Sequence, residues 1–178
     1  MIVILVLALI PLQHDVSAQD EAKGECMEIT LKSPAFSQDS MIPDVYTCKG
    51  KDISPPLFWS NIPKGTKTIS LICDDPDAPI GTWVHWVVYN IPGSAKGLAE
   101  GIPCKEVLED STVQGKNDFR KTGYRGPCPP FGIHRYYFKI YALDTRLDLK
   151  PNATKKELLV AMEGHILAQG QLMGRYKK

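Results

Sequence analysis

Residues 84–91 (VHWVVYNI) carry an apolar or aromatic side chain at nearly every position rather than at every second one. A strand with one face in water would alternate apolar and polar residues, so this run indicates a strand that is buried on both faces. Such a strand needs neighbouring strands and other structure packed against each of its faces. This requirement constrains the fold more than any other stretch of the chain.

Further short β-type runs, each bounded by Pro, Gly, Asn or Asp, predict that the domain is mostly β. The predicted strands are residues 27–31, 57–59, 68–74, 84–91 and 136–143. Residues 92–117 hold scattered Gly, Pro and charge with little periodicity, which predicts a long connection with room for one short strand.

One helix is predicted near the C-terminus. Thr154 is followed three residues later by Glu157, a spacing that forms a capping box at a helix N-terminus. Gly164 is a plausible end of this helix. Residues 166–176 then read as a last extended strand.

The length of 178 residues fits one domain. Residues 2–12 are almost wholly apolar, and small side chains at Val16-Ser17-Ala18 follow where a signal peptidase cleaves. We predict a signal peptide over residues 1–18, a flexible mature N-terminus over residues 19–25 and a single domain over residues 26–178. The protein would then be secreted, periplasmic or on the extracellular face. Only the α-amino group supplies positive charge before the apolar run, so an uncleaved membrane anchor is the alternative.

The charge balance argues against nucleic acid as a partner. Residues 1–18 hold Asp15 and no Lys or Arg, so their removal changes the formal charge from +1 to +2. A surface so close to neutral does not hold a polyanion electrostatically.

Five cysteines lie in the predicted mature chain, so at least one stays unpaired within a monomer. Export would expose them to oxidising conditions, but sequence alone does not choose among the pairings. No Cys-x-x-Cys spacing occurs, so neither a zinc knuckle nor a thioredoxin-type motif is supported.

Three carboxylates crowd the segment Asp74-Asp75-Pro76-Asp77-Ala78-Pro79, at the end of a predicted strand. Carboxylates this close raise one another's pKa unless hydrogen-bond donors intervene, so we expect donors nearby. The segment fits a functional loop, and it equally fits an Asp-Pro turn whose side chains accept backbone N–H bonds. Because cis proline occurs in tight turns, Ala78-Pro79 is a candidate cis bond.

Two histidines occupy matching positions, each at the mouth of a strand that leaves a Pro- or Gly-rich loop. A lone histidine such as His85 is more often a satisfied core residue than a ligand, but the paired placement of His134 favours a shared site. With an Asp carboxylate and an aromatic side chain such as Trp83 or Tyr136, the two imidazoles predict a pocket for a phosphate or carboxylate group.

Four segments in a fixed order resemble the phosphatidylethanolamine-binding protein family, in the prokaryotic branch often called Raf kinase inhibitor-like. They are residues 47–57 (TCKGKDISPPL), 75–79 (DPDAP), 83–92 (WVHWVVYNIP) and 126–136 (GPCPPFGIHRY). The match is colinear from about residue 27 to residue 176. It implies a mostly β fold, with a large antiparallel sheet, a smaller sheet packed on it and one or two short helices, including one in the C-terminal region.

The resemblance also implies an anion pocket without a cofactor or metal. Asp77 would stabilise its loop, and Asp75 would have to be hydrogen-bonded or protonated where it faces an anion. The implied ligand-binding residues are Asp75, Pro79, Trp83, His85, Pro129, Pro130, Gly132, His134 and Tyr136.

Cys48 and Cys128 lie in two of the matching segments, both near the implied pocket, so the resemblance suggests a disulfide between them. Buried free thiols are the alternative, because similar residues occur in relatives that look cytoplasmic. Asn152-Ala153-Thr154 has the form of a glycosylation sequon, a triplet that also arises often by chance.

Three functions follow as expectations, in decreasing order. The first is an exported binding protein for a small anion, either phosphate, carboxylate or a phospholipid headgroup. The second is a peptidase inhibitor or signalling modulator that acts through protein contacts; the family resemblance also allows a homodimer. The third is a hydrolase using Asp75, His85 and His134, which is disfavoured because no activated nucleophile such as Gly-x-Ser-x-Gly is present.

Overall fold

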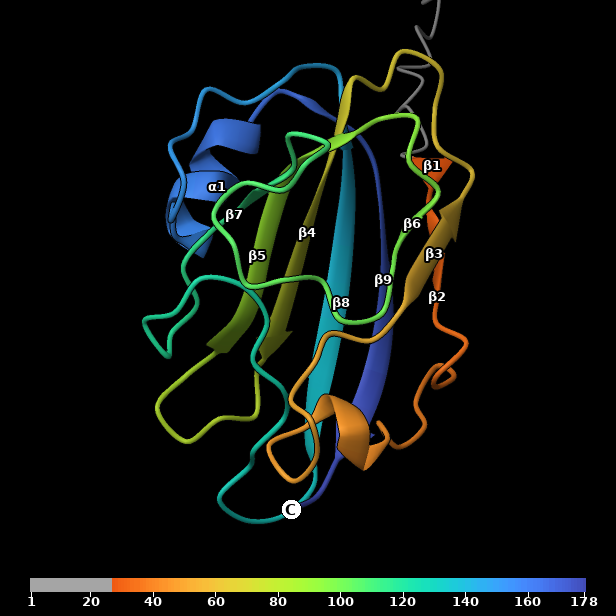
Figure 1. The fold of residues 1–178 in the computed structure, drawn as a ribbon. Helices are drawn as coiled ribbons and strands as arrows, with labels where there is room; N and C mark the ends of the chain where they lie inside the picture. The colour runs from red at the N-terminus through yellow and green to blue at the C-terminus, as the bar shows by residue number, and fades with distance from the viewer. Residues whose placement is uncertain (1–26) are drawn as a thin grey trace, which may run out of the picture.

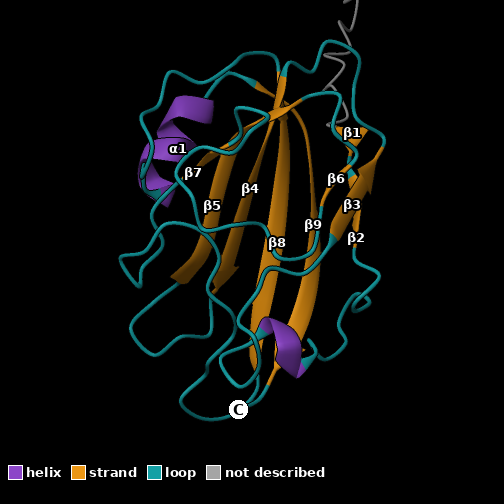
Figure 2. Ribbon diagram, in the orientation of Figure 1, coloured by secondary structure: helices purple, strands orange, loops and turns teal. Residues whose placement is uncertain are grey.

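Two sheets and one α-helix form three layers in the computed structural model, which describes residues 27–178 (Figures 1 and 2). The predicted signal peptide and mature N-terminus lie outside the described residues. The large sheet has the order β1-β9-β8-β4-β5-β7, and the small sheet has the order β2-β3-β6. The large sheet contains β1 (Met27–Glu28), β4 (Thr68–Asp75), β5 (Trp83–Pro92), β7 (Val113–Gln114), β8 (His134–Leu143) and β9 (Ile166–Tyr176). The small sheet contains β2 (Thr30–Lys32), β3 (Leu57–Ser60) and β6 (Gly97–Leu98).

Strand β5 is buried on both faces, as its composition predicts. It lies between β4 and β7 in the large sheet. Trp86 and Val88 pack into the core between the two sheets, whereas Val87 and Tyr89 pack into a second core under the helix. The neighbours on both faces explain why this strand shows no alternation of polar residues.

The prediction of one strand over residues 27–31 is wrong, because the chain changes sheets there. β1 pairs parallel with β9, and β2 pairs antiparallel with β3. Ile29 lies between them, fully buried, and its N–H donates to the carbonyl of Gln169 at 2.8 Å. A change of sheet leaves the apolar pattern nearly intact, so the pattern alone does not show it. The pairing of β1 with β9 is parallel, whereas the other strand pairs of the large sheet are antiparallel.

The connection over residues 92–117 holds two short strands, β6 and β7, where we expected one. Each is only two residues long and pairs with a longer neighbour, β3 or β5. Two residues are too few to show a period in sequence. For the same reason the 3₁₀ helix η1 (Asp44–Tyr46) was not predicted.

Helix α1 (Lys155–Met162) begins and ends where the sequence predicts. Thr154 is the N-cap, and it exchanges hydrogen bonds with Glu157 in a capping box. Gly164 follows the helix with φ of 76°, a left-handed conformation that glycine adopts without strain. No helix in residues 27–178 combines the length and the apolar character needed to cross a membrane.

A fully buried carboxylate ties α1 to the large sheet. Asp74 on β4 accepts a hydrogen bond from Lys139 Nζ on β8 at 2.9 Å and another from Lys155 Nζ on α1. A buried charge is tolerated when it is paired and hydrogen-bonded, and here two ammonium groups share it.

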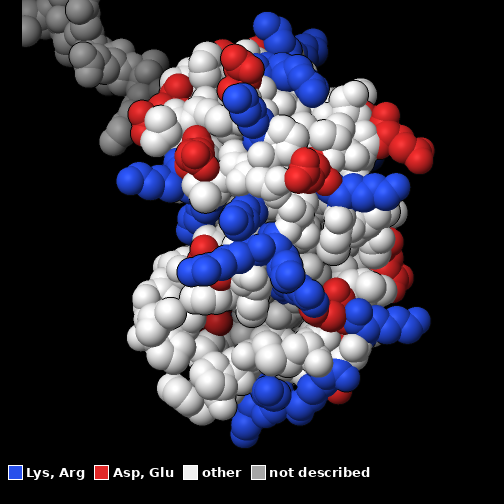
Figure 3. Space-filling view, turned by 60° about the vertical axis from the view of Figure 1, so that its left-hand side comes forward, with Lys and Arg blue, Asp and Glu red and all other residues white. Residues whose placement is uncertain are grey.

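Across the face seen in Figure 3, basic and acidic side chains are interspersed.

Replacing Thr154 with alanine should lower the free energy of unfolding by about 1 kcal/mol, because the capping box loses its side-chain acceptor. Urea unfolding followed by circular dichroism measures the change. Lys156→Ala is the matched control, because this exposed residue lies in the same turn and takes no part in the box. Equal stability of the two variants would contradict the prediction.

Candidate functional site

The candidate site lies at the end of the large sheet that also holds the C-terminus (Figure 1). The last residue of β4, Asp75, pairs with the first residue of β5, Trp83. His134 begins β8 and pairs with Tyr176 of β9. Four strand ends therefore lie at the same end of the sheet, and the loops that lead from or into them surround the site.

A cavity of about 270 Å³ opens between these loops. It brings together eight of the nine ligand-binding residues that the family resemblance implies: Asp75, Pro79, Trp83, His85, Pro129, Pro130, His134 and Tyr136. Gly132 does not line it, and lies instead in a neighbouring groove with φ of 71°. The Ala78–Pro79 bond is trans, in a turn closed by the Gly81 N–H to the Ala78 carbonyl at 3.1 Å. Trans proline suits the second position of a turn, so the cis bond is not needed.

Asp75 orients His134. Its Oδ2 lies 2.7 Å from His134 Nδ1, and both side chains are about 95% buried. Its Oδ1 accepts a hydrogen bond from the Asp77 N–H at 2.8 Å. Both carboxylate oxygens are thus used within the protein, so Asp75 holds the imidazole ring in place with Nε2 on the opposite side.

His85 is fixed in one tautomer by the backbone. Its Nδ1 lies 2.6 Å from the carbonyl oxygen of Arg125, and a carbonyl can only accept, so Nδ1 carries the proton. Burial lowers the pKa of His85, against smaller opposing effects of that hydrogen bond and of Asp75, Asp52 and Asp118. The neutral ring therefore has a bare lone pair on Nε2. Within residues 27–178, the Nε2 atoms of His85 and His134 make no hydrogen bond.

Tyr136 places a hydroxyl without a partner beside these rings. The phenol oxygen is buried and makes no hydrogen bond of ordinary geometry in the described part of the chain, although Asp75 and the Cys128 backbone are its polar neighbours. Its ring packs edge-on against His85 with the centroids 5.2 Å apart. Burial raises the pKa of Tyr136 well above its usual value, so the hydroxyl stays protonated and can donate. A buried hydroxyl of this kind needs a partner, which a ligand in the cavity can supply.

Asp77 lies outside the cavity and braces the loop. Its carboxylate accepts from the Arg135 backbone N–H and Nε at 2.9 Å each, and from Nη2 at 2.6 Å. These hydrogen bonds lower the pKa of Asp77 to about 2, so it stays ionised at any ordinary pH. The bidentate pair joins the loop after β4 to the start of β8.

Four lining residues were missed in the sequence: Ala78, Ile80, Phe119 and Cys128. Phe119 comes from the long connection between β7 and β8, and it packs edge-on against Trp83 at 5.4 Å and His85 at 5.3 Å. Nothing in the pattern around this residue distinguishes it from an exposed loop residue. Because Phe119 is far in sequence from most of the other lining residues, only the fold shows that it lines the cavity.

The disulfide between Cys48 and Cys128 is present, with the Cα atoms 5.5 Å apart. Cys128 lines the cavity, and the Cys48 N–H donates to the Pro127 carbonyl at 3.1 Å. The bond therefore ties one wall of the cavity to the loop that follows η1. Of the other described cysteines, Cys73 is a buried thiol and Cys104 is exposed.

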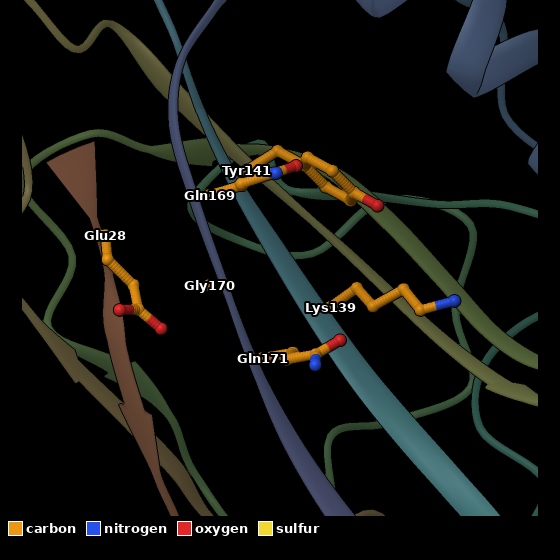
Figure 4. A pocket seen from close by; sticks show the side chains of 6 residues that line it. All are labelled: Glu28, Lys139, Tyr141, Gln169, Gly170 and Gln171. Atoms are coloured by element: carbon orange, nitrogen blue, oxygen red, sulfur yellow. The ribbon is translucent and has the colours of Figure 1, made fainter. Parts of the chain in front are cut away.

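A larger hollow of about 570 Å³ lies over β1, β8 and β9 (Figure 4). Glu28 and Lys139 lie on opposite sides of β9 there, and Lys139 points away from Glu28. The Lys139 ammonium is already bonded to Asp74. The charged groups of this hollow do not converge, so it is a weaker candidate than the smaller cavity despite its size. Among the described residues, no group of three or more His, Cys, Asp or Glu side chains is arranged to hold a metal.

Comparison with known proteins gives matches over most of the chain. A family model described as phosphatidylethanolamine-binding protein matches residues 32–177. A UPF0098 protein of Methanothermobacter thermautotrophicus is 53% identical over 150 residues, which cover 84% of this chain and 99% of the relative. A UPF0098 protein of Aquifex aeolicus is 50% identical over 161 residues, covering 88% and 92%.

Two crystal structures share the fold. CT736, a phosphatidylethanolamine-binding protein homologue from Chlamydia trachomatis, is 45% identical with a TM-score of 0.79, over 85% of this chain and 98% of that one. YbcL from E. coli, described as a member of the mammalian PEBP family, is 30% identical with a TM-score of 0.76, over 85% and 99%. With the family model, these relatives and the two-sheet fold in agreement, the chain belongs to the phosphatidylethanolamine-binding protein family, in its prokaryotic branch.

Proposed function

We propose that the protein binds one small anionic group, a phosphate or a carboxylate, in the cavity between β4, β5 and β8. The observation that carries the proposal is the convergence of three groups without partners: the Nε2 atoms of His85 and His134 and the hydroxyl of Tyr136. The rest of the wall is largely apolar, which strengthens hydrogen bonds to a bound anion.

Binding rather than catalysis is the proposed role. Each carboxylate oxygen of Asp75 already accepts a hydrogen bond, from His134 or from the Asp77 N–H, which favours a role in positioning His134 over a role as a base. Among the described lining residues, the nucleophile-type side chain is that of Cys128, and its sulfur is bonded to Cys48. We also propose that the protein is exported. The apolar residues 2–12 and the disulfide support this location, because disulfides persist in oxidising compartments.

Anion binding should be coupled to proton uptake by His85. Nδ1 already donates to the Arg125 carbonyl, so Nε2 can donate to an anion only when the ring is protonated. Burial lowers the pKa of the free ring, so at neutral pH the ring must gain a proton as the anion binds. The charges that face the ring are those of Asp75, Asp52 and Asp118, all of which favour the protonated form.

The affinity for sulfate should therefore rise as the pH falls from about 8 to about 5.5, by up to about tenfold per unit while the free ring is neutral. Sulfate is the probe because it does not itself titrate in this range. Isothermal titration calorimetry in buffers of different ionisation enthalpy gives both the affinity and the number of protons taken up. An affinity independent of pH, with no proton uptake, would contradict the role of His85. Absence of any binding of sulfate, phosphate and acetate would contradict the proposed function.

A further inference from the structure

A second groove lies next to the anion cavity. His134 is among the residues that line each of the two spaces, so the two are neighbours. The groove has a volume of about 520 Å³. Its walls come from the loop after β4, the loop before β8, the start of β8 and the end of β9: Asp77, Phe131, Gly132, Ile133, His134, Arg135 and Arg175.

The backbone along this groove is free to bind another chain. In the described part of the protein, no hydrogen bond involves the N–H or C=O groups of Phe131, Gly132 or Ile133. The segment ends where His134 joins the ladder between β8 and β9. Three consecutive residues therefore present backbone donors and acceptors beside the entrance to the anion cavity. An extended peptide can use such groups, whereas a hydrocarbon chain cannot.

Large apolar side chains surround the same entrance. Ile80 is 81% exposed, Phe131 is 69% exposed and Ile133 is 55% exposed. Phe131 packs edge-on against His134, with the ring centroids 6.3 Å apart. Exposed apolar residues that cluster around a pocket mark a contact surface more often than single ones do.

We propose that the cavity and groove together bind the C-terminal tail of a peptide. The α-carboxylate and an apolar last side chain would enter the cavity, and the preceding residues would lie extended along residues 131–133, exchanging backbone hydrogen bonds with them. The charge of the ligand complements the protonated His85 ring and the Tyr136 hydroxyl in the cavity. This inference rests on the proposed function, because it names the source of the carboxylate. Arg135 and Arg175 are already paired with Asp77 and Asp39, so the groove favours an apolar tail rather than an acidic one.

The test uses a fluorescently labelled hexapeptide ending in Ala-Leu, as the free acid, as the C-terminal amide and with an N-methyl group on its last peptide bond. Fluorescence anisotropy against the mature protein measures each affinity. We expect the free acid to bind at least about tenfold more tightly than the amide, because the charge-assisted hydrogen bonds are lost. The N-methylated peptide should bind more weakly than the free acid, by about fivefold, because one backbone donor is lost.

Two variants separate the groove from the cavity. The double variant Phe131→Ser, Ile133→Ser should weaken the free acid about tenfold but sulfate by less than about twofold, because neither side chain lines the cavity and Phe131 touches it only through its edge-on contact with His134. Ile166→Ser is the matched control, since this side chain is 40% exposed at the start of β9, away from the groove. Both affinities should be unchanged in it.

The outcomes distinguish the two proposals. If sulfate binds but the free acid binds no more tightly than acetate or the amide, the peptide inference fails and the anion pocket stands. If neither sulfate nor any peptide binds, the proposed function itself fails. A flotation assay with vesicles containing phosphatidylethanolamine tests the alternative that the apolar entrance binds a lipid surface. Vesicle binding that is lost in the double variant, without peptide binding, would assign the apolar entrance to a lipid surface and overturn the peptide inference.

Discussion

Replacing His85 with alanine should weaken sulfate binding by about 10- to 150-fold and lower the number of protons taken up on binding by about one. The magnitude follows from the loss of a hydrogen bond to a charged group, which contributes about 1.5–3 kcal/mol. The pH dependence should become shallower because one of the groups that take up a proton on binding is gone. Calorimetric titration of the wild type and the variant at about pH 6 measures the first effect, and repetition at about pH 8 measures the second.

His165→Ala is the control for this experiment. His165 is about half exposed, and its Nδ1 is 2.8 Å from Asp144 at the opposite end of the sheet, where β9 begins. Its removal should leave sulfate binding unchanged. A second variant, His85→Asn, guards against misfolding, because its amide can still donate to the Arg125 carbonyl. Wild-type affinity in both His85 variants would place the anion elsewhere.

Removing the disulfide should produce the largest loss of stability. The bond joins residues that are 80 apart in sequence, and closing a loop of that length restricts the unfolded chain by about 4–5 kcal/mol at room temperature. For a domain of this size, the melting temperature of Cys48→Ser, Cys128→Ser should fall by about 10–15 °C. Differential scanning calorimetry measures the shift, and wild-type protein reduced with dithiothreitol should show the same one.

Cys104→Ser is the matched variant, because it removes an exposed thiol that is not in the disulfide. It should melt at the wild-type temperature. A change of less than about 3 °C in the double variant would mean that the contacts around the bond hold the loops together without it. Those contacts are the Cys48 N–H to the Pro127 carbonyl, the Gly126 N–H to Asp52 at 2.6 Å and the Tyr124 hydroxyl to the Tyr46 carbonyl at 2.9 Å.

The strands that were predicted well include the long ones, whether they are buried throughout like β4 or alternate like β8. β4, β5, β8 and β9 each differ from the predicted bounds by no more than two residues at either end. In strands of this length the order of apolar and polar residues forms a recognisable pattern, so the sequence alone locates the strand. The strands that were missed or merged, β1, β2, β6 and β7, are two or three residues long and depend on a partner strand that is distant in sequence.

For the candidate site, too, some features could be recognised from the sequence and others could not. The strand-end positions of Asp75, His85 and His134 could be recognised from the residues that flank them, and the family resemblance supplied the remaining positions. The roles within the site could not be recognised. Asp75 is bonded to a histidine 59 residues away, and the tautomer of His85 is fixed by a carbonyl 40 residues away.

The sequence by itself determined which segments are buried strands, where the C-terminal helix begins and which side chains could bind an anion, because each of these depends on neighbours within a few residues. Only the tertiary structure decided that Phe119 closes the cavity, that Gly132 faces a separate groove and that Asp75 serves His134. Those outcomes depend on where distant loops meet, and loop closure is fixed by the packing of the whole domain rather than by any local pattern.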